Sequence, residues 1–273
     1  SAMLIVDSQV HLWNAGTPNP WHRQIPASSN DDLLAEMDAA GVDRAVILPP
    51  MWMGDTNDLS LEASLAHPES LSVLGLISLK DPASASKLED WNNQPGMLGL
   101  RFTFSKPEEF TWLTDGSLEW LWAGAEQAGI PVMVMISGYL PQVAKIAENH
   151  PDLRLCIDHL GLVRGAIDDA AFADLPLLLA LANYSNVVVK ATSLPCYSTE
   201  AYPYPGLHSY IRQVYDAFGP ARMFWGSDVT RLTCTYRECI TLVTDELDWL
   251  SDADKELIMG RAICDWLGWD TAA

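Results

Sequence analysis

Short apolar runs alternate along the chain with longer segments in which apolar residues recur every three or four positions. The short runs are rich in β-branched residues, which is typical of strands, and the longer segments have the period of amphipathic helices. The predicted strands are Leu4–Gln9, Arg44–Pro49, Ser72–Ile77, Met97–Thr103, Val132–Ile136, Arg154–Asp158, Val187–Ala191 and Met223–Gly226. The predicted helices are Asp31–Ala40, Leu59–His67, Ser84–Asn92, Ser117–Ala128, Pro141–Asn149, Ala171–Ala182, Leu207–Phe218 and Arg237–Leu250.

Helix ends support this division of the chain. Gly41 and Gly129 each follow a helical segment directly, and Pro68 and Pro151 stop two more. Near-continuous apolar strands such as Val132–Ile136 indicate a parallel sheet that is buried on both faces. Eight strand-helix units in one chain predict an α/β fold, a single (β/α)8 TIM barrel. We expect one domain over residues 3–273, with a C-terminal extra helix at Asp252–Leu267.

Composition narrows the class of partner. Asp and Glu number 36 against 16 Lys and Arg, so the net charge is −20, which argues against nucleic acid or an anionic membrane as a partner. No apolar run is long enough for a membrane helix, and no GxGxxG or P-loop motif is present. Ser1-Ala2 is interpreted as a cloning remnant before Met3, with no signal peptide. Five scattered cysteines without a CxxC pair predict reduced thiols and a cytoplasmic protein.

Polar residues at the carboxyl ends of the strands are the candidates for chemistry, because barrel active sites lie there. Three of them are His11, His159 and Asp228, at the ends of the first, sixth and eighth predicted strands. Two imidazoles and a carboxylate can bind a divalent metal or move protons around a bound water. The two-residue period of a strand predicts that Asp7, Gln9 and His11 point to one side. We therefore interpret His11, His159 and Asp228 as catalytic residues.

These residues carry a resemblance to a known family. Asp7-x-Gln9-x-His11-Leu-Trp13, Asp158-His159-Leu-Gly161, Lys190 and Trp225-Gly-Ser-Asp228 occur in this order and spacing over nearly the whole chain. The ordered set resembles the amidohydrolase-related (amidohydrolase 2) family of TIM-barrel hydrolases, in particular its lactonase-like members. The resemblance implies a hydrolase that opens a small lactone or a similar cyclic ester or carbonyl compound.

Position 9 departs from the family pattern and leaves the cofactor open. The family usually has Asp-x-His-x-His on the first strand, whereas this chain has Gln9, and an amide oxygen is a weaker ligand than imidazole for zinc-like ions. Without metal, the resemblance implies that Asp228 is the general base and that His11 and His159 assist. With metal, His11, His159 and Asp228 would hold one Zn or Mn ion for a decarboxylase or hydratase of an aromatic or unsaturated acid. A third alternative is a degenerate barrel that binds a ligand without catalysis.

Several further side chains are expected to contact a small, cyclic and in some cases acidic substrate. Arg101 lies at a strand end where a guanidinium suits a carboxylate, although a structural pairing with a neighbouring acid is an equal alternative. The predicted contacts are Arg101, Gln9, Trp13, Trp52, Tyr139 and Tyr197, with Arg164 and Arg231 as weaker candidates. The loop aromatics could instead pack on one another or on a second copy in a homo-oligomer.

A second group of polar and soft side chains is expected to be structural. Lys190 is interpreted as a salt-bridge partner beneath the site. Met133 and Met135 are interpreted as core residues, and His67 and His150 as solvated helix ends. His208 stays open between the two roles.

Overall fold

Eight parallel strands form one sheet in which neighbours in the chain are neighbours in space. The computed structural model describes residues 2–271. At the remaining edge, the backbone amide of Asp228, just after the last strand, donates to the carbonyl of Gln9 at 2.9 Å, so the sheet is a nearly closed barrel. The predicted (β/α)8 fold is confirmed. The strands are β1 (Val6–Val10), β2 (Arg44–Ile47), β3 (Leu71–Gly75), β4 (Met97–Phe104), β5 (Val132–Ile136), β6 (Leu155–Ile157), β7 (Val187–Thr192) and β8 (Met223–Gly226).

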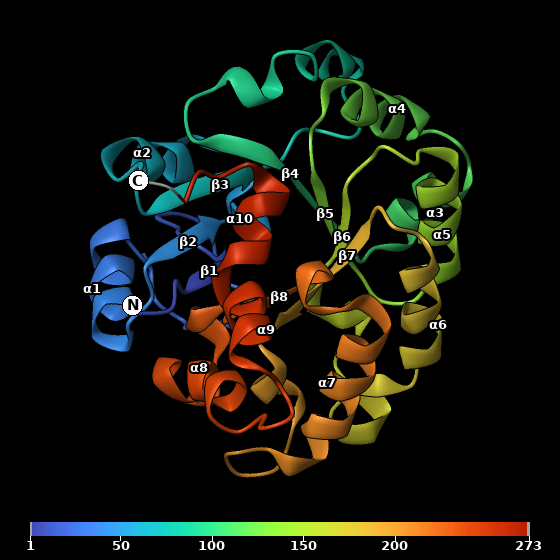
Figure 1. Cartoon of the computed structure of the whole chain (residues 1–273). Coiled ribbons are helices and arrows are strands. Elements are labelled where there is room, and N and C mark those ends of the chain that lie inside the picture. The colour runs from blue at the N-terminus through green and yellow to red at the C-terminus, as the bar shows by residue number, and fades with distance from the viewer. Residues whose placement is uncertain (1, 272–273) are drawn as a thin grey trace.

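Helices surround the strands, as Figure 1 shows. The first helix begins with a capping box between Ser29 and Asp32 and ends at Ala40, directly before Gly41, which takes a left-handed conformation. None of the helices within residues 2–271 combines the length and hydropathy needed to cross a bilayer. The helices are α1 (Asn30–Ala40), α2 (Asp58–Ala66), α3 (Pro107–Thr114), α4 (Glu119–Ala128), α5 (Leu140–Asn149), α6 (Leu175–Ala180), α7 (Pro205–Phe218), α8 (Tyr236–Thr244), α9 (Asp252–Glu256) and α10 (Ala262–Leu267).

Two predicted helices are wrong in type or length. The segment predicted as a helix at Ser84–Asn92 forms the 3₁₀ turns Pro82–Lys87 and Trp91–Asn93. There, the Ser86 hydroxyl donates to the Ala83 carbonyl at 2.8 Å, a side-chain bond to a carbonyl that the first helical turn would use. The segment predicted at Ala171–Ala182 is divided into the 3₁₀ turn Asp168–Phe172, the short α6 and a 3₁₀ turn at Leu181–Asn183.

The segment after β8 and the connection between β4 and β5 differ from the prediction as well. The helix predicted to reach Leu250 ends at Thr244. The extra helix predicted at Asp252–Leu267 is present but is interrupted by a π-helical turn at Leu257–Arg261. A Cβ on Gly260 would lie 2.4 Å from the Leu4 carbonyl oxygen, so this turn brings the helix backbone against the start of the chain. Helix α3 was not predicted.

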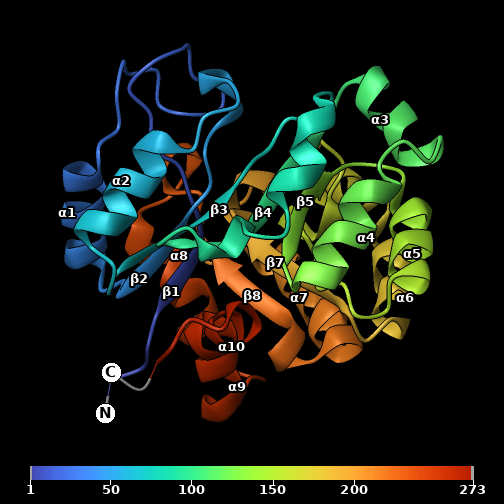
Figure 2. The ribbon, with the colours of Figure 1, turned by 90° about the horizontal axis from the view of Figure 1, so that it is seen from above.

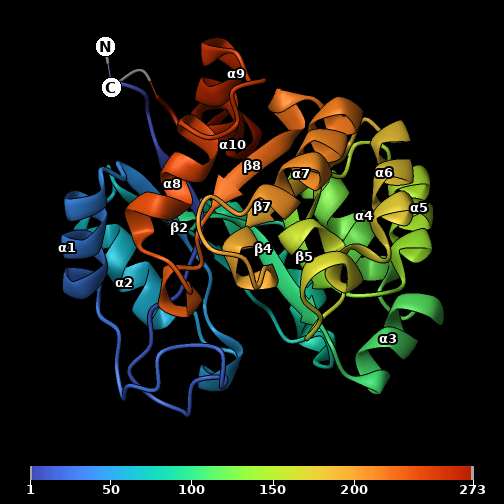
Figure 3. The same ribbon diagram turned by 90° about the horizontal axis from the view of Figure 1, so that it is seen from below.

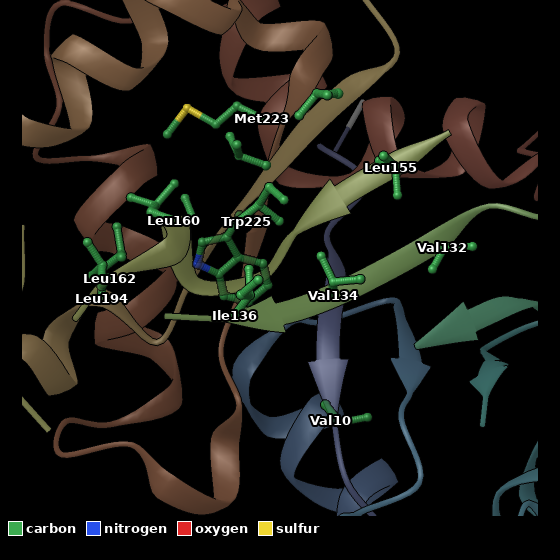
Figure 4. Packing of buried hydrophobic residues seen from close by; sticks show 14 of the residues in the cluster. Val10, Val132, Val134, Ile136, Leu155, Leu160, Leu162, Leu194, Met223 and Trp225 are labelled. Carbon is green, nitrogen blue, oxygen red and sulfur yellow. The ribbon is translucent and has the colours of Figure 1, made fainter. Parts of the chain in front are cut away.

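The core has two layers, one inside the barrel and one between barrel and helices. The inner layer contains Val6, Leu74 and Phe224, and it is closed at one end by Ile263 and Leu267 of α10. Figures 2 and 3 show α9 and α10 at that end of the barrel and the long connections after β1 and β2 at the opposite end. Figure 4 shows side chains of the outer layer, among them Val132, Val134 and Ile136 of β5, Leu155 of β6 and Trp225 of β8. Because α10 closes one end of the barrel, the carboxyl ends of the strands form its open end.

Candidate active site

A cavity of about 220 Å³ opens at the carboxyl ends of the strands. It brings together residues at the ends of five strands, β1, β4, β5, β6 and β8, and of the connections that follow strands. Of the predicted site residues, all except Trp13 and Tyr139 line it. The lining includes Gln9, His11, Trp52, Arg101, His159, Tyr197, Asp228 and Arg231, with His22, Arg164 and Met135 at its walls.

The end of β1 carries an irregularity that the two-residue period does not predict. The pairing of β1 with β2 shifts register between Asp7 and Val10. Val6 therefore packs inside the barrel, whereas Val10 packs in the outer layer. Asp7 bonds to Tyr236 of α8, so the prediction that Asp7 points to the same side as Gln9 and His11 is wrong. The extra residue of the bulge turns Gln9 and His11 together into the cavity.

Asp7 holds the ends of β1 and β8 together. Its carboxylate accepts from the Ser227 backbone amide at 2.8 Å, from the Tyr236 hydroxyl at 2.5 Å and from the Gln9 backbone amide at 3.1 Å. The Ser227 hydroxyl also donates to it. Burial raises the pKa of Asp7, and these donors oppose the rise. The first residue of the β1 motif is therefore a structural clamp that places Asp228, the residue after Ser227.

Two imidazoles, a carboxylate and an amide converge at the floor of the cavity. His11 Nε2 lies 3.4 Å from Asp228 Oδ1. The Gln9 Nε2 atom lies 3.3 Å from both Asp228 Oδ2 and His159 Nε2, and 3.5 Å from His11 Nε2. The other nitrogen of each ring is bonded outward, His11 Nδ1 to the Leu48 carbonyl at 2.6 Å and His159 Nδ1 to the Thr192 hydroxyl at 2.6 Å. The Nε2 atoms of both rings therefore face the centre of the cluster.

The electrostatics keep both imidazoles neutral and the carboxylate ionised. Burial lowers the pKa of His11 to about 4 and that of His159 to about 3. Burial alone would raise the pKa of Asp228, but His11, His22, Arg231 and His159 bring it down to about 2. Asp228 and His159 both adopt left-handed backbone conformations, with φ of 53° and 52°, which are uncommon for residues with a Cβ and concentrate at functional sites. At neutral pH the cluster therefore carries one negative charge, on Asp228, and the Gln9 side-chain amide donates to that carboxylate.

Arginines line the cavity although the chain is strongly acidic. Arg101 Nε and Lys190 Nζ each lie 3.0 Å from an oxygen of the buried Asp158, which confirms the predicted salt bridge of Lys190 beneath the site. Arg101 still reaches the cavity, so its pairing and its contact with the pocket coexist. Arg231 packs over the Tyr197 ring, and its buried Nε atom has no hydrogen-bond partner in the described residues. The cavity therefore offers guanidinium donors to an anion.

Comparison with known proteins identifies the family. The amidohydrolase family profile matches residues 6–268. The chain belongs to the amidohydrolase family. It is an enzyme of the hydrolase type.

Two curated relatives of this amidohydrolase are lactone hydrolases by name. It is 26% identical over 242 residues to an L-fucono-1,5-lactonase from Burkholderia ambifaria, a match that covers 83% of this chain and 81% of the relative. It is 24% identical over 230 residues to a 4-sulfomuconolactone hydrolase from Rhizobium radiobacter, covering 81% and 74%. A solved structure of an amidohydrolase from Burkholderia multivorans with bound zinc superposes with a TM-score of 0.81 at 21% identity, covering 97% of this chain and 99% of the other.

His22, in the connection after β1, is a residue of the amidohydrolase site that the sequence analysis did not single out. Its Nδ1 atom lies 2.8 Å from the Thr230 hydroxyl, and its ring centre lies 5.3 Å from that of His11. One donor atom each of His11, His22 and Asp228 lies within 4.8 Å of the others, a set of ligand types that suits a divalent ion. His159, named in the predicted metal set, is not part of this group. The only signal in the sequence was a histidine among the tryptophans of that connection.

The aromatic residues of the amidohydrolase divide between lining and support. Trp52 and Tyr197 line the cavity. Trp13 is fully buried, donates from Nε1 to the Ile25 carbonyl at 3.0 Å and packs edge-on against Trp52. Tyr139 is 48% exposed and stacks on Phe110. Trp13 therefore supports the wall from behind.

Other sequence predictions have mixed outcomes in the amidohydrolase. His150 is buried between the carboxylates of Glu119 and Glu126, at 2.8 and 3.0 Å, so the prediction of a solvated helix end is wrong. Met133 packs inside the barrel as predicted, but Met135 lines the cavity. His208 lies outside the cavity lining and bonds to the Pro203 carbonyl at 2.7 Å. The cysteines are free thiols, as expected.

Proposed function

We propose that this amidohydrolase opens small lactones that carry a negative charge, by adding water to the ring carbonyl. The observation that carries the proposal is the cluster at the cavity floor, where the Nε2 atoms of two neutral imidazoles and an ionised carboxylate face one point. Such a set can accept the hydrogens of a water molecule and hold its lone pair toward a substrate. The two relatives named as lactone hydrolases support the same reaction class.

In the proposed reaction, Asp228 takes a proton from water while the water oxygen bonds to the carbonyl carbon. The tetrahedral species then collapses, the ring C–O bond breaks, and the proton passes to the departing oxygen, which leaves a hydroxy acid. His11 and His159 accept hydrogen bonds that orient the water, and Arg101 and Arg231 stabilise the developing oxyanion or a substrate carboxylate. A divalent ion with His11 and Asp228 among its ligands would supply Lewis-acid polarisation of the water or the carbonyl.

The low proton affinity of Asp228 favours an anionic substrate. A general base that works near neutral pH needs a substantial proton affinity, whereas the pKa of Asp228 is lowered to about 2, because His11, His22 and Arg231 outweigh burial. A substrate carboxylate paired with Arg231 would neutralise the positive charge of that guanidinium. The proton affinity of Asp228 would then rise on binding, so the base would become effective only with a substrate of the right charge.

The net charge of −20 adds a second argument for local recognition. The field of the whole protein repels anions, so an acidic substrate needs compensating charge at the site itself. Arg101, Arg164 and Arg231 all line the cavity and supply it. Arg164, which packs over Trp21 at the rim, would meet the substrate first.

A panel of neutral and carboxylate-bearing lactones tests the proposal, with acid release as the readout. We expect turnover of charged lactones, and Asp228→Asn should lower kcat by about 10²- to 10⁴-fold, the usual contribution of a general base. Asp216→Asn, on the exposed face of α7, is the matched control and should retain activity. Arg231→Met should raise KM for charged lactones and leave KM for neutral ones unchanged. Full turnover by Asp228→Asn, or CO₂ release from aromatic acids without lactone turnover, would refute the proposal.

A further inference from the structure

We propose that the connection after β1 supplies His22 as a protein ligand of a divalent-metal site, together with His11 and Asp228. Position 9, which points into the same cluster, carries an amide instead of an imidazole. The structure thus assigns to a loop residue the coordination that the strand does not provide. This inference does not depend on the lactone proposal, because metal binding is measured without substrate.

The first argument is the state of the acceptors around Asp228. His11 Nδ1 lies 2.6 Å from the Leu48 carbonyl, so this nitrogen carries the ring proton and the lone pair of Nε2 points toward Asp228. Asp228 Oδ1 is buried and has no hydrogen-bond donor in the described residues, and it lies 3.4 Å from His11 Nε2. The Gln9 amide is 3.5 Å from His11 Nε2 but makes no hydrogen bond to Oδ1, so these two acceptors face each other with no hydrogen between them. A cation or a proton between them would satisfy both. Bonds of about 2.0–2.2 Å to a tetrahedral zinc also separate its ligands by about 3.4 Å.

The second argument is that Gln9 blocks the side of the cluster where His159 lies. The Gln9 Nε2 atom is 3.3 Å from Asp228 Oδ2 and 3.3 Å from His159 Nε2. An amide N–H group donates to both of these acceptors and repels a cation, so an ion is disfavoured between them. Oδ1, the oxygen on the His11 side, is left for a metal, and His22 is the second histidine of the group that surrounds it.

The third argument is that His22 is held in place although it belongs to a loop. Its Nδ1 atom lies 2.8 Å from the Thr230 hydroxyl, and the next residue, Arg23, donates its backbone amide to the Thr230 carbonyl at 2.9 Å. Thr230 follows Asp228 by two residues, so the same segment positions both ligands. A second hydrogen bond on each ligating imidazole is the usual outer-shell arrangement of metal sites. His22 is only partly buried and lines the cavity, so the site is open to the pocket.

Cobalt titration of the metal-stripped enzyme tests this assignment through affinity and visible absorption. We expect one Co²⁺ per wild-type chain and at least a 100-fold weaker Kd for His22→Ala, measured against a competing chelator. His159→Ala should weaken binding by less than tenfold. His67→Ala, which removes an imidazole at the end of α2 away from the cavity, should leave Kd unchanged. Circular dichroism and Tm of each metal-free variant separate loss of a ligand from loss of the fold.

A spectroscopic signature tests direct ligation. His22→Cys should add a thiolate-to-cobalt charge-transfer band that the wild-type protein, with its five cysteines, does not show. The assignment would be overturned by wild-type affinity in His22→Ala, by transfer of the large loss to His159→Ala, or by absence of cobalt binding at millimolar concentration. None of these results changes the interpretation of the lactone assay, and a failed lactone assay does not change the interpretation of the cobalt titration.

Discussion

Replacement of Lys190 by Met removes one cation from a carboxylate that has no contact with water. Lys190 and Asp158 are both fully buried as side chains, and their charged atoms lie 3.0 Å apart. Burial alone would raise the pKa of Asp158, but Lys190 and then Arg101 lower it, so the carboxylate depends on both cations for its charge. Breaking a buried pair by removing one partner costs about 3–5 kcal/mol, because the remaining charge stays buried. At about 2 °C of Tm per kcal/mol for a chain of this size, Lys190→Met should lower Tm by about 6–10 °C.

Thermal and urea unfolding at neutral pH measure this effect. Lys145→Met, on the exposed face of α5, is the matched control and should change Tm by less than about 2 °C. The double variant Lys190→Met with Asp158→Asn should recover part of the loss, since it removes the unpaired charge. A Tm of Lys190→Met within about 2 °C of wild type would refute the view that this ion pair supports the site. The same result would also argue against Asp158 as the residue that holds Arg101 in position.

Two further predictions follow from the site and its scaffold. The folded-state pKa of His11 and His159, about 4 and about 3, lies below the ordinary value of 6.5, so the unfolded chain binds protons that the folded chain does not, and stability falls as pH drops from 7 to 5. Each ring contributes about 2 kcal/mol to this fall, and Asp7, with its raised pKa, opposes it. His11→Gln should therefore reduce the loss of unfolding free energy between pH 7 and pH 5 by about 2 kcal/mol in urea titrations. An unchanged loss would contradict the low pKa of His11. Gly226→Ala should destabilise the fold by about 1–3 kcal/mol and lower kcat, because its Cβ would lie 2.3 Å from Ser8 Oγ at the strand end that positions Asp228. Wild-type stability in urea would contradict this, since it would show that the strand end shifts to accommodate the methyl group.

The barrel was predictable because its strands have a strong and redundant pattern. A strand such as Val132–Ile136 is buried on both faces, so its apolar run marks the element whatever follows it. Helical segments were less secure where side chains offered the backbone other partners, as Ser86 does in the Pro82–Lys87 turn. The π-helical turn at Leu257–Arg261 depends on the close approach of Gly260 to Leu4, a contact between the two ends of the chain. Local periodicity contains no information about such a contact.

The same distinction divides the candidate site. His11, His159 and Asp228 follow strands, and parallel strands bring their carboxyl ends to one edge, so finding the strands was enough to bring these residues together. The bulge in β1 could not be predicted, because it is enforced by donors from Ser227 and Tyr236 that lie far along the chain from Asp7. His22 reaches the site through bonds between two connections, which no strand or helix period describes. The loss of a metal ligand on a strand can therefore be offset by a loop residue at a position that the strand pattern does not indicate. We expect this exchange between Gln9, where the strand lacks the histidine, and His22, which supplies one from the loop.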